Sequence, residues 1–217
     1  MLQIPRKIRE HAERELKNDP KAYALAKRDE LLMTWLTTLP WRWNDIRELE
    51  VGPRRSGANL LFDRIPRSAA TALPGWVKKA LRHNSRERFW QFCTCDSYRI
   101  TGYARHALLP RQLVAPLEEY LGLHRPLIVK GRDPGNLFLN QNGSAFDASS
   151  FTRLVGALTL RHIGTRVTPG GFRTSFASKW VEERPGGIFT LSKILRLRSV
   201  RTCMETVGAS LNESLRV

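Results

Sequence analysis

The spacing of the apolar residues changes twice along this chain, and that change limits the folds it can adopt. Residues 57–66, 86–95 and 105–110 are short apolar runs of the kind that form strands. On either side of them, as in residues 20–39 and 147–164, apolar residues recur at helical spacing. The sequence therefore predicts an α+β fold, mostly helical, with a small antiparallel sheet before the midpoint.

Capping residues predict where several helices begin and end. Residues 147–164 begin after a capping Asp147 and stop at Gly164, and residues 74–84 begin at Pro74 and end near Asn84. Further helical segments are expected near Asn44, over 111–124 despite Pro116, over 167–180 and over 188–211.

The first segment, residues 4–18 or "IPRKIREHAERELKN", is a highly charged helix candidate. It has too few apolar residues to bury a full face. We therefore expect residues 1–19 to be a charged N-terminal helix or arm, either solvated or docked on a partner. Residues 20–217 are expected to form one domain.

The charge of the chain favours a nucleic-acid partner. The sequence has 36 Lys and Arg against 20 Asp and Glu, a formal net charge of +16. A surface this basic gains affinity for phosphates by releasing their counterions. The alternative is a ribosome-like or simply soluble basic protein.

The three cysteines, Cys93, Cys95 and Cys203, do not form a disulfide framework. Cys93 and Cys95 would point to one face of a strand, which favours ordinary buried thiols over a zinc pair. No histidine lies at a metal-ligand spacing from them. We expect neither a metal nor a cofactor.

The chain starts with charged residues throughout "MLQIPRKIREHAERELK", unlike a signal peptide. No apolar run approaches the ~20 residues that a bilayer span requires. A cytoplasmic location, with reduced thiols and no membrane partner, is the expectation.

Residues 167–180, "VTPGGFRTSFASKW", predict a helix that carries one cation beside an apolar face. Thr168 can cap it, Pro169 suits its first turn, and aromatic residues recur from Phe172 onward at helical spacing. Arg173 lies among these small and aromatic residues, directly after a glycine pair. A permanent charge in this position requires a partner or a function.

Three separated segments together resemble the catalytic domain of tyrosine recombinases, the phage-integrase family. "TTLPWRWNDIREL" resembles the first box, with Arg42, Asp45 and Leu49 matching its pattern. "TPGGFRTSFAS" resembles the second box, with Arg173 as its arginine, and "LSKILRLRSVRTCMETV" resembles the last. The resemblance implies that fold from about residue 20 to the end, and double-stranded DNA as the partner.

The chain departs from this family at the positions that carry the chemistry. Gly170 stands at the place of the box-two histidine or lysine, and Leu197 at that of the last histidine. Thr206 occupies the place of the nucleophilic tyrosine, and Thr101 or Gly102 that of the hairpin lysine.

In the mechanism that the resemblance implies, two arginines clamp the phosphate while a tyrosine attacks it and a lysine protonates the leaving hydroxyl. Clamping needs only fixed guanidinium groups, whereas cleavage needs a nucleophile and a proton donor. Arg42 and Arg173 are therefore expected to converge and hold a DNA phosphate without cutting it. The alternative is that Arg173 is structural and pairs with a buried carboxylate such as Asp45.

Two residues could replace the nucleophile. Thr206 is a poor candidate because an aliphatic alcohol without an adjacent base is a weak nucleophile. Cys203 lies nearly one helical turn away, and a negative Glu205 beside it would raise the pKa of its thiol.

Other residues are expected to contact DNA. The stretch "SKILRLRSVRT" has no acid before Glu205, and helical spacing would place its cations in two neighbouring pairs; a solvated helix face is the alternative. Hairpin side chains are candidates for DNA contacts, although their aromatic rings could equally pack on the domain. The full set comprises Arg54, Arg55, Arg99, Tyr103, Arg105, Lys193, Arg196, Arg198 and Arg201.

These observations predict an inactive relative of tyrosine recombinases that binds double-stranded DNA in the nucleoid and serves a mobile element as an accessory or regulatory factor. Residues 1–19 are too short for the core-binding domain that the family uses as the second half of its clamp. Other recombination or transposition proteins, or a second copy of the chain, are therefore expected partners. The alternatives are a recombinase with a displaced nucleophile and a protein-interaction scaffold.

Overall fold

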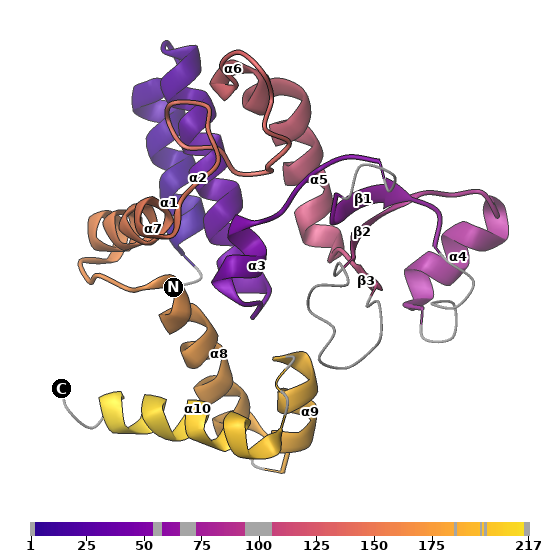
Figure 1. The fold of residues 1–217 in the computed structure, drawn as a ribbon, viewed down its shortest axis with the longest axis vertical. Helices are drawn as coiled ribbons and strands as arrows, with labels where there is room; N and C mark the ends of the chain where they lie inside the picture. Colours follow the sequence, from indigo (N-terminus) through magenta and orange to yellow (C-terminus); the bar gives the residue numbers. More distant parts are fainter. Residues whose placement is uncertain are drawn as a thin grey trace.

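A computed structural model describes residues 3–53, 58–65, 73–93, 106–184, 186–195, 197 and 199–214. Helices dominate the structure, as the sequence predicts, and one small sheet lies between α5 and α4 (Figure 1). The α-helices are α1 (Ile4–His11), α2 (Pro20–Thr38), α3 (Trp43–Arg47), α4 (Gly75–His83), α5 (Arg111–Glu119), α6 (Arg125–Ile128), α7 (Ala148–Ile163), α8 (Pro169–Glu183), α9 (Ile188–Ile194) and α10 (Val200–Ser214). Two π-helical turns, η1 (Ala12–Leu16) and η5 (Tyr120–His124), extend α1 and α5.

The sheet has three antiparallel strands in the order β1 (Leu60–Asp63), β2 (Phe89–Cys93) and β3 (His106–Leu108). Phe62 lies opposite Trp90, and Phe92 lies opposite Ala107. The ring of Phe92 lies 4.4 Å from that of Trp41, which joins the sheet to the helical core. All three predicted strands are confirmed.

The predicted caps of α7 and α8 are also confirmed. The Asp147 side chain accepts a hydrogen bond from the backbone N–H of Ser150, and Gly164 ends α7 with a φ of 74°. The Thr168 side chain accepts from the N–H of Gly171 at the start of α8. Local capping chemistry is therefore sufficient to locate these two helices.

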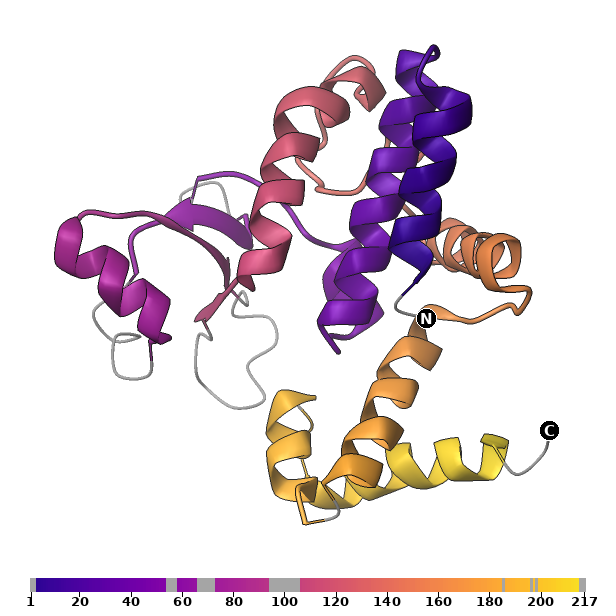
Figure 2. The ribbon, with the colours of Figure 1, turned by 180° about the vertical axis from the view of Figure 1, so that it is seen from behind.

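The N-terminal segment forms a helix, as predicted, but it packs against α2 along one face, so the expectation of a free solvated arm was wrong. Ile4, Ile8 and Ala12 have exposed fractions of 0%, 2% and 1%, and they belong to the same core cluster as Trp35 of α2. α1 lies along α2 in both views of the molecule (Figures 1 and 2). A spacing of four residues places these three small or branched side chains on one narrow stripe, which is enough to pack against a neighbouring helix.

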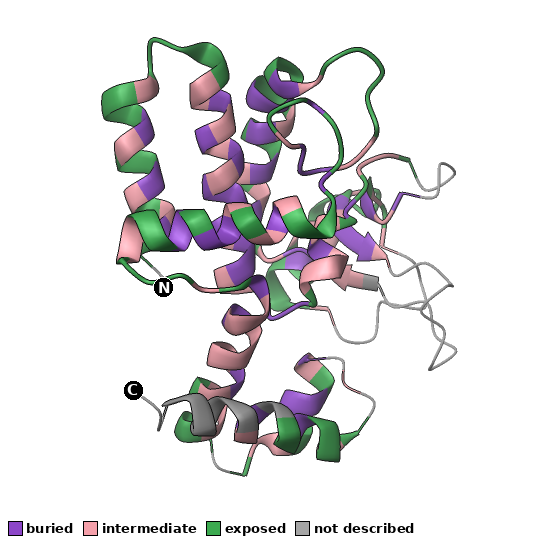
Figure 3. Ribbon diagram, turned by 60° about the vertical axis from the view of Figure 1, so that its left-hand side comes forward, coloured by how far each residue is buried: buried purple, intermediate pink, exposed green. Residues whose placement is uncertain are grey.

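Two hydrophobic clusters meet on α8. Phe172, in its first half, is buried in the main cluster, whereas Ala177, one and a half turns later, is buried in a second cluster with Leu191, Leu195 and Cys203. Figure 3 shows α8 as largely half-buried between the main body and the C-terminal helices. α8 is thus the element that connects the main body to α9 and α10 (Figure 1).

Candidate nucleic-acid interface

The structure brings the segments of Arg42 and Arg173 together. Arg42 is exposed at the N-cap of α3. Arg173 is half-buried on α8, and its Nη1 donates a hydrogen bond of 3.0 Å to the carbonyl oxygen of Pro40. Because Pro40 precedes Arg42 by two residues, this bond holds α8 beside the loop that carries Arg42.

The Arg173 guanidinium also binds the end of α9. Its Nη2 donates to the carbonyl oxygen of Leu195, the C-cap residue of that helix. A cation is favourable at a helix C-terminus, where the last carbonyls carry partial negative charge. These two bonds are made to backbone carbonyls, and they fix the orientation of the planar guanidinium between three segments of the chain.

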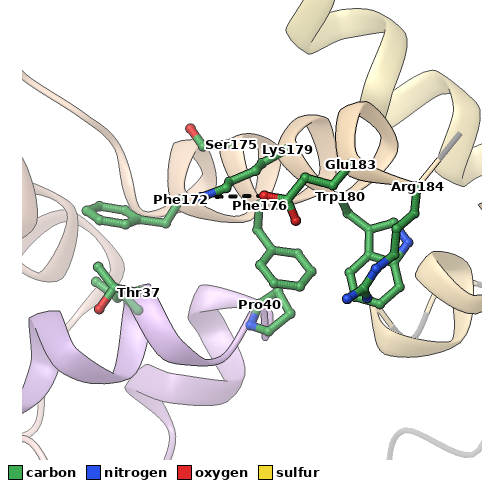
Figure 4. A pocket seen from close by; sticks show the side chains of 10 residues that line it. Thr37, Pro40, Phe172, Ser175, Phe176, Lys179, Trp180, Glu183 and Arg184 are labelled. Carbon is green, nitrogen blue, oxygen red and sulfur yellow. Dashed lines mark ion pairs between the residues drawn. The ribbon is translucent and has the colours of Figure 1, made fainter. Parts of the chain in front are cut away.

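A groove of about 540 Å³ lies next to these contacts, between the end of α2 and the exposed side of α8 (Figure 4). Its walls include Leu36, Thr37, Pro40, Phe172, Phe176 and Trp180. At its far end the guanidinium of Arg184 lies 4.2 Å from the Trp180 ring centroid, a cation–π contact. The sequence analysis did not identify this groove, because its two walls are far apart in the chain.

Comparison with known proteins identifies the fold of this chain. No family model matches the sequence, and no curated protein is significantly similar to it. The structure of XerA recombinase is similar, with a TM-score of 0.53 and 18% identity over 99% of this chain and 60% of that chain. XerH site-specific recombinase bound to its difH substrate, in a pre-cleavage complex, has a TM-score of 0.54 and 18% identity over 89% of this chain and 46% of that chain.

A post-cleavage complex of XerH with palindromic difH gives a TM-score of 0.57 and 17% identity, over 99% of this chain and 51% of that chain. The fold is that of a tyrosine-recombinase catalytic domain. The chain thus spans about half to three fifths of the length of these three recombinases.

Within this recombinase fold, Gly170 lies in the first turn of α8 and is not required there by sterics. A Cβ built at Gly170 would meet its nearest heavy atom at 3.9 Å, whereas one at Gly171 would meet Val167 Cγ1 at 2.9 Å. A Cβ would therefore fit at position 170, so no contact at the Cβ position requires a glycine there.

Two other positions that the sequence analysis assigned to missing catalytic residues lie in or near the C-terminal helices. Leu197 is half-buried, packs against the second cluster and donates its backbone N–H to the Ser192 carbonyl at 2.9 Å. Thr206 lies on α10, but its side chain is outside the described residues, as are Thr101 and Gly102. An aliphatic side chain such as that of Leu197 can neither donate nor accept a proton.

Cys203 is buried, with an exposed fraction of 0%. Burial raises the pKa of its thiol, and the nearby positive charge of Arg173 opposes this shift. The cause of the higher pKa is burial, whereas the sequence analysis expected Glu205 to raise it; Glu205 pairs instead with Arg201, at 3.2 Å. An inaccessible, protonated thiol is a poor nucleophile.

The predicted continuous basic helix over residues 188–211 does not form. α9 ends at Ile194, and α10 begins at Val200, where the Ser199 hydroxyl accepts from the N–H of Thr202 at 3.2 Å. Ser199 is a capping residue that the sequence analysis overlooked. Lys193 and Arg201 are exposed on different helices, and Arg196 and Arg198 lie outside the described residues.

The other residues that were predicted to contact DNA lie outside the described residues. They are Arg54, Arg55, Arg99, Tyr103 and Arg105. The strands that flank the hairpin, β2 and β3, pair antiparallel as predicted.

Within the residues that the structure does describe, no group of three His, Cys, Asp or Glu could hold a metal ion, and no helix is long and apolar enough to cross a bilayer.

Proposed function

We propose that this protein binds double-stranded DNA as a catalytically inactive relative of tyrosine recombinases. The observation that carries this proposal is the hydrogen bond from Arg173 to the Pro40 carbonyl. This bond holds Arg173 beside the segment that carries Arg42. These are the two residues that resemble the family's phosphate-binding arginines.

The chemistry of the side chains supports phosphate binding without strand cleavage. The exposed guanidinium of Arg42 and the oriented guanidinium of Arg173 would hold one phosphate through paired, charge-assisted hydrogen bonds. Gly170 and Leu197 offer no acid or base to activate a nucleophile or protonate a leaving group. Binding without strand cleavage is the consequence.

The structural neighbours support DNA as the partner. Both XerH structures are complexes of that recombinase with a difH substrate. We propose an equivalent duplex here, and a role as an accessory targeting or regulatory factor of a mobile element, associated with the nucleoid. Another recombination or transposition protein, or a second copy of this chain, would supply the opposite side of the clamp.

Two other functions compete with this proposal. A recombinase with a displaced nucleophile would need Thr206, Cys203 or a nucleophile from another subunit, and the complete burial of Cys203 argues against the thiol. A scaffold for acidic proteins would use the same basic surface, and it is favoured only if duplex DNA binds no better than heparin.

Selection from a pool of random duplexes at physiological salt tests the proposal directly. We expect bound DNA, and an enriched sequence would identify a specific site. A nicked duplex that contains this site should give no denaturation-resistant protein–DNA adduct. An adduct would establish an active recombinase, and the absence of any DNA binding would favour the scaffold.

A further inference from the structure

α4 carries a strongly basic surface that the sequence analysis did not consider. The helix is anchored by Val77, which is fully buried, and by Trp76, whose ring meets that of Phe89 edge-on at 5.7 Å. Figures 1 and 2 place α4 beyond the sheet, away from α7 and α8. Its surface is therefore separate from the segments of Arg42 and Arg173.

The outer side of α4 and the turn after it expose five cations. These are Lys78, Lys79, Arg82, Arg86 and Arg88, and we call them the α4 basic surface. The only acid in this stretch is Glu87, which accepts a hydrogen bond from the Asn84 side chain at 2.9 Å. Within the described part of the chain, none of the five cations forms an ion pair.

Three exposed cations on other helices form ion pairs within their own helix. Arg6, Lys179 and Arg201 each pair with a glutamate four residues later, at 3.4, 3.7 and 3.2 Å. On α4 the residue four positions after Lys78 is Arg82, another cation. Like charges one turn apart destabilise a helix and oppositely charged pairs stabilise it, so α4 would be stabilised by an external anion.

The geometry of the α4 basic surface favours the DNA backbone as that anion. Lys78 and Arg82 are separated by about 6 Å along the helix axis. Phosphates two nucleotides apart on one strand are separated by about 6.8 Å along the duplex axis, so the two cations can contact separate phosphates. Trp76 is 38% exposed beside these cations, with its ring edge-on to Phe89, so the surface offers one partly covered ring and not the row of open rings on which successive unpaired bases stack. Phosphate contacts without base stacking are typical of duplex binding.

We propose that the α4 basic surface is a second contact with double-stranded DNA, independent of Arg42 and Arg173. This inference rests on the proposed function, because it assumes that the protein binds duplex DNA. It adds a sequence-independent electrostatic contact on the far side of the sheet, which lengthens the stretch of duplex that one protein molecule engages.

The test compares binding of a 30-base-pair duplex by three proteins over a series of salt concentrations, using fluorescence anisotropy. They are the wild type, a triple variant with Lys78→Ala, Lys79→Ala and Arg82→Ala, and a control variant with Arg14→Ala, Lys17→Ala and Arg132→Ala. The control loses the same charge from exposed positions elsewhere. We expect the α4 variant to bind roughly tenfold more weakly at physiological salt, with a log–log salt slope shallower by up to about 2.7.

The control variant should retain a slope within about one unit of the wild type, because its cations make no phosphate contact in this proposal. A charge-preserving variant, Lys78→Arg with Lys79→Arg and Arg82→Lys, should restore wild-type binding. Combining the α4 variant with Arg42→Ala should give additive losses, since the two contacts are independent.

The outcomes separate this inference from the proposed function. If the wild type binds no duplex, both are overturned. If Arg42→Ala weakens duplex binding but the α4 variant binds like the wild type, the proposed function stands and this inference is overturned. It is likewise overturned if the α4 variant keeps duplex affinity but loses affinity for a single-stranded 30-mer or for polyglutamate, which would assign the surface to another partner.

Discussion

Arg173 donates a hydrogen bond of 3.0 Å to the carbonyl oxygen of Pro40, a residue 133 positions earlier in the chain. Through its other terminal nitrogen it binds the carbonyl of Leu195. One guanidinium thus connects the loop before α3, the helix α8 and the end of α9. The arginine proposed to hold a phosphate therefore also holds the fold together.

Replacement of Arg173 should affect stability as well as DNA binding. Arg173→Ala removes two hydrogen bonds from a charged donor, each worth about 1.5–3 kcal/mol, so we expect the free energy of unfolding to fall by about 3–6 kcal/mol. Urea denaturation measures this loss. Lys179→Ala, an exposed change on the same helix, should alter stability by less than about 0.5 kcal/mol. An unchanged midpoint for Arg173→Ala would mean that the two carbonyl contacts are not important in solution.

Replacement of Arg42 should separate binding from folding. Its side chain is exposed and makes no capping hydrogen bond, so Arg42→Ala should leave the urea midpoint nearly unchanged. Loss of one phosphate contact should flatten the salt dependence of duplex binding by about one unit. Wild-type affinity and slope in this variant would exclude Arg42 from the DNA interface.

The glycine pair at the start of α8 should respond asymmetrically. Gly170→Ala should raise the free energy of unfolding by about 0.5 kcal/mol, because it restricts the unfolded chain and its Cβ has room. Gly171→Ala should instead destabilise the protein, since its Cβ would press on Val167 at 2.9 Å. Equal effects of the two substitutions would contradict the packing described for this turn.

Cys203 should be unreactive in the folded protein. A raised pKa leaves less thiolate at neutral pH than a thiol of ordinary pKa would have, and burial blocks the reagent. Site-resolved mass spectrometry after iodoacetamide treatment at pH 7.5 should show slow labelling of Cys203 that becomes fast in urea. Rapid labelling without urea would show that α9 and α10 open readily.

The raised pKa of Cys203 also affects the stability of the protein at high pH. The folded state holds the Cys203 proton more tightly than the unfolded state, so this stabilisation is complete below the ordinary thiol pKa of 9.0 and is lost as the pH rises above it. Cys203→Ala should reduce the alkaline loss of stability. If wild type and variant lose stability in parallel above pH 9, another group is responsible.

The buried stripe on α1 predicts that the N-terminal helix contributes to stability. Ile8→Ala should lower the free energy of unfolding by about 2–4 kcal/mol because the side chain is 2% exposed. Arg6→Ala, on the outer side of the same helix, should have little effect. A small effect of both substitutions would restore the view of residues 1–19 as a solvated arm.

Much of the fold can be predicted from the sequence because its signals are local. The three strands carry their own apolar runs, and Asp147, Gly164 and Thr168 mark helix ends through hydrogen bonds to residues within four positions. The break between α9 and α10 was also locally encoded, by Ser199, but the surrounding arginines and leucines continued a helical pattern that concealed it.

The sequence by itself determined the basic charge and the mostly helical α+β class. The tertiary structure alone decided that α1 is buried, that Arg173 reaches Pro40 and Leu195, and that Cys203 is inaccessible. These facts depend on contacts between segments far apart in the chain. Burial and hydrogen-bond partners of that kind are properties of packing, and no local pattern of residues specifies them.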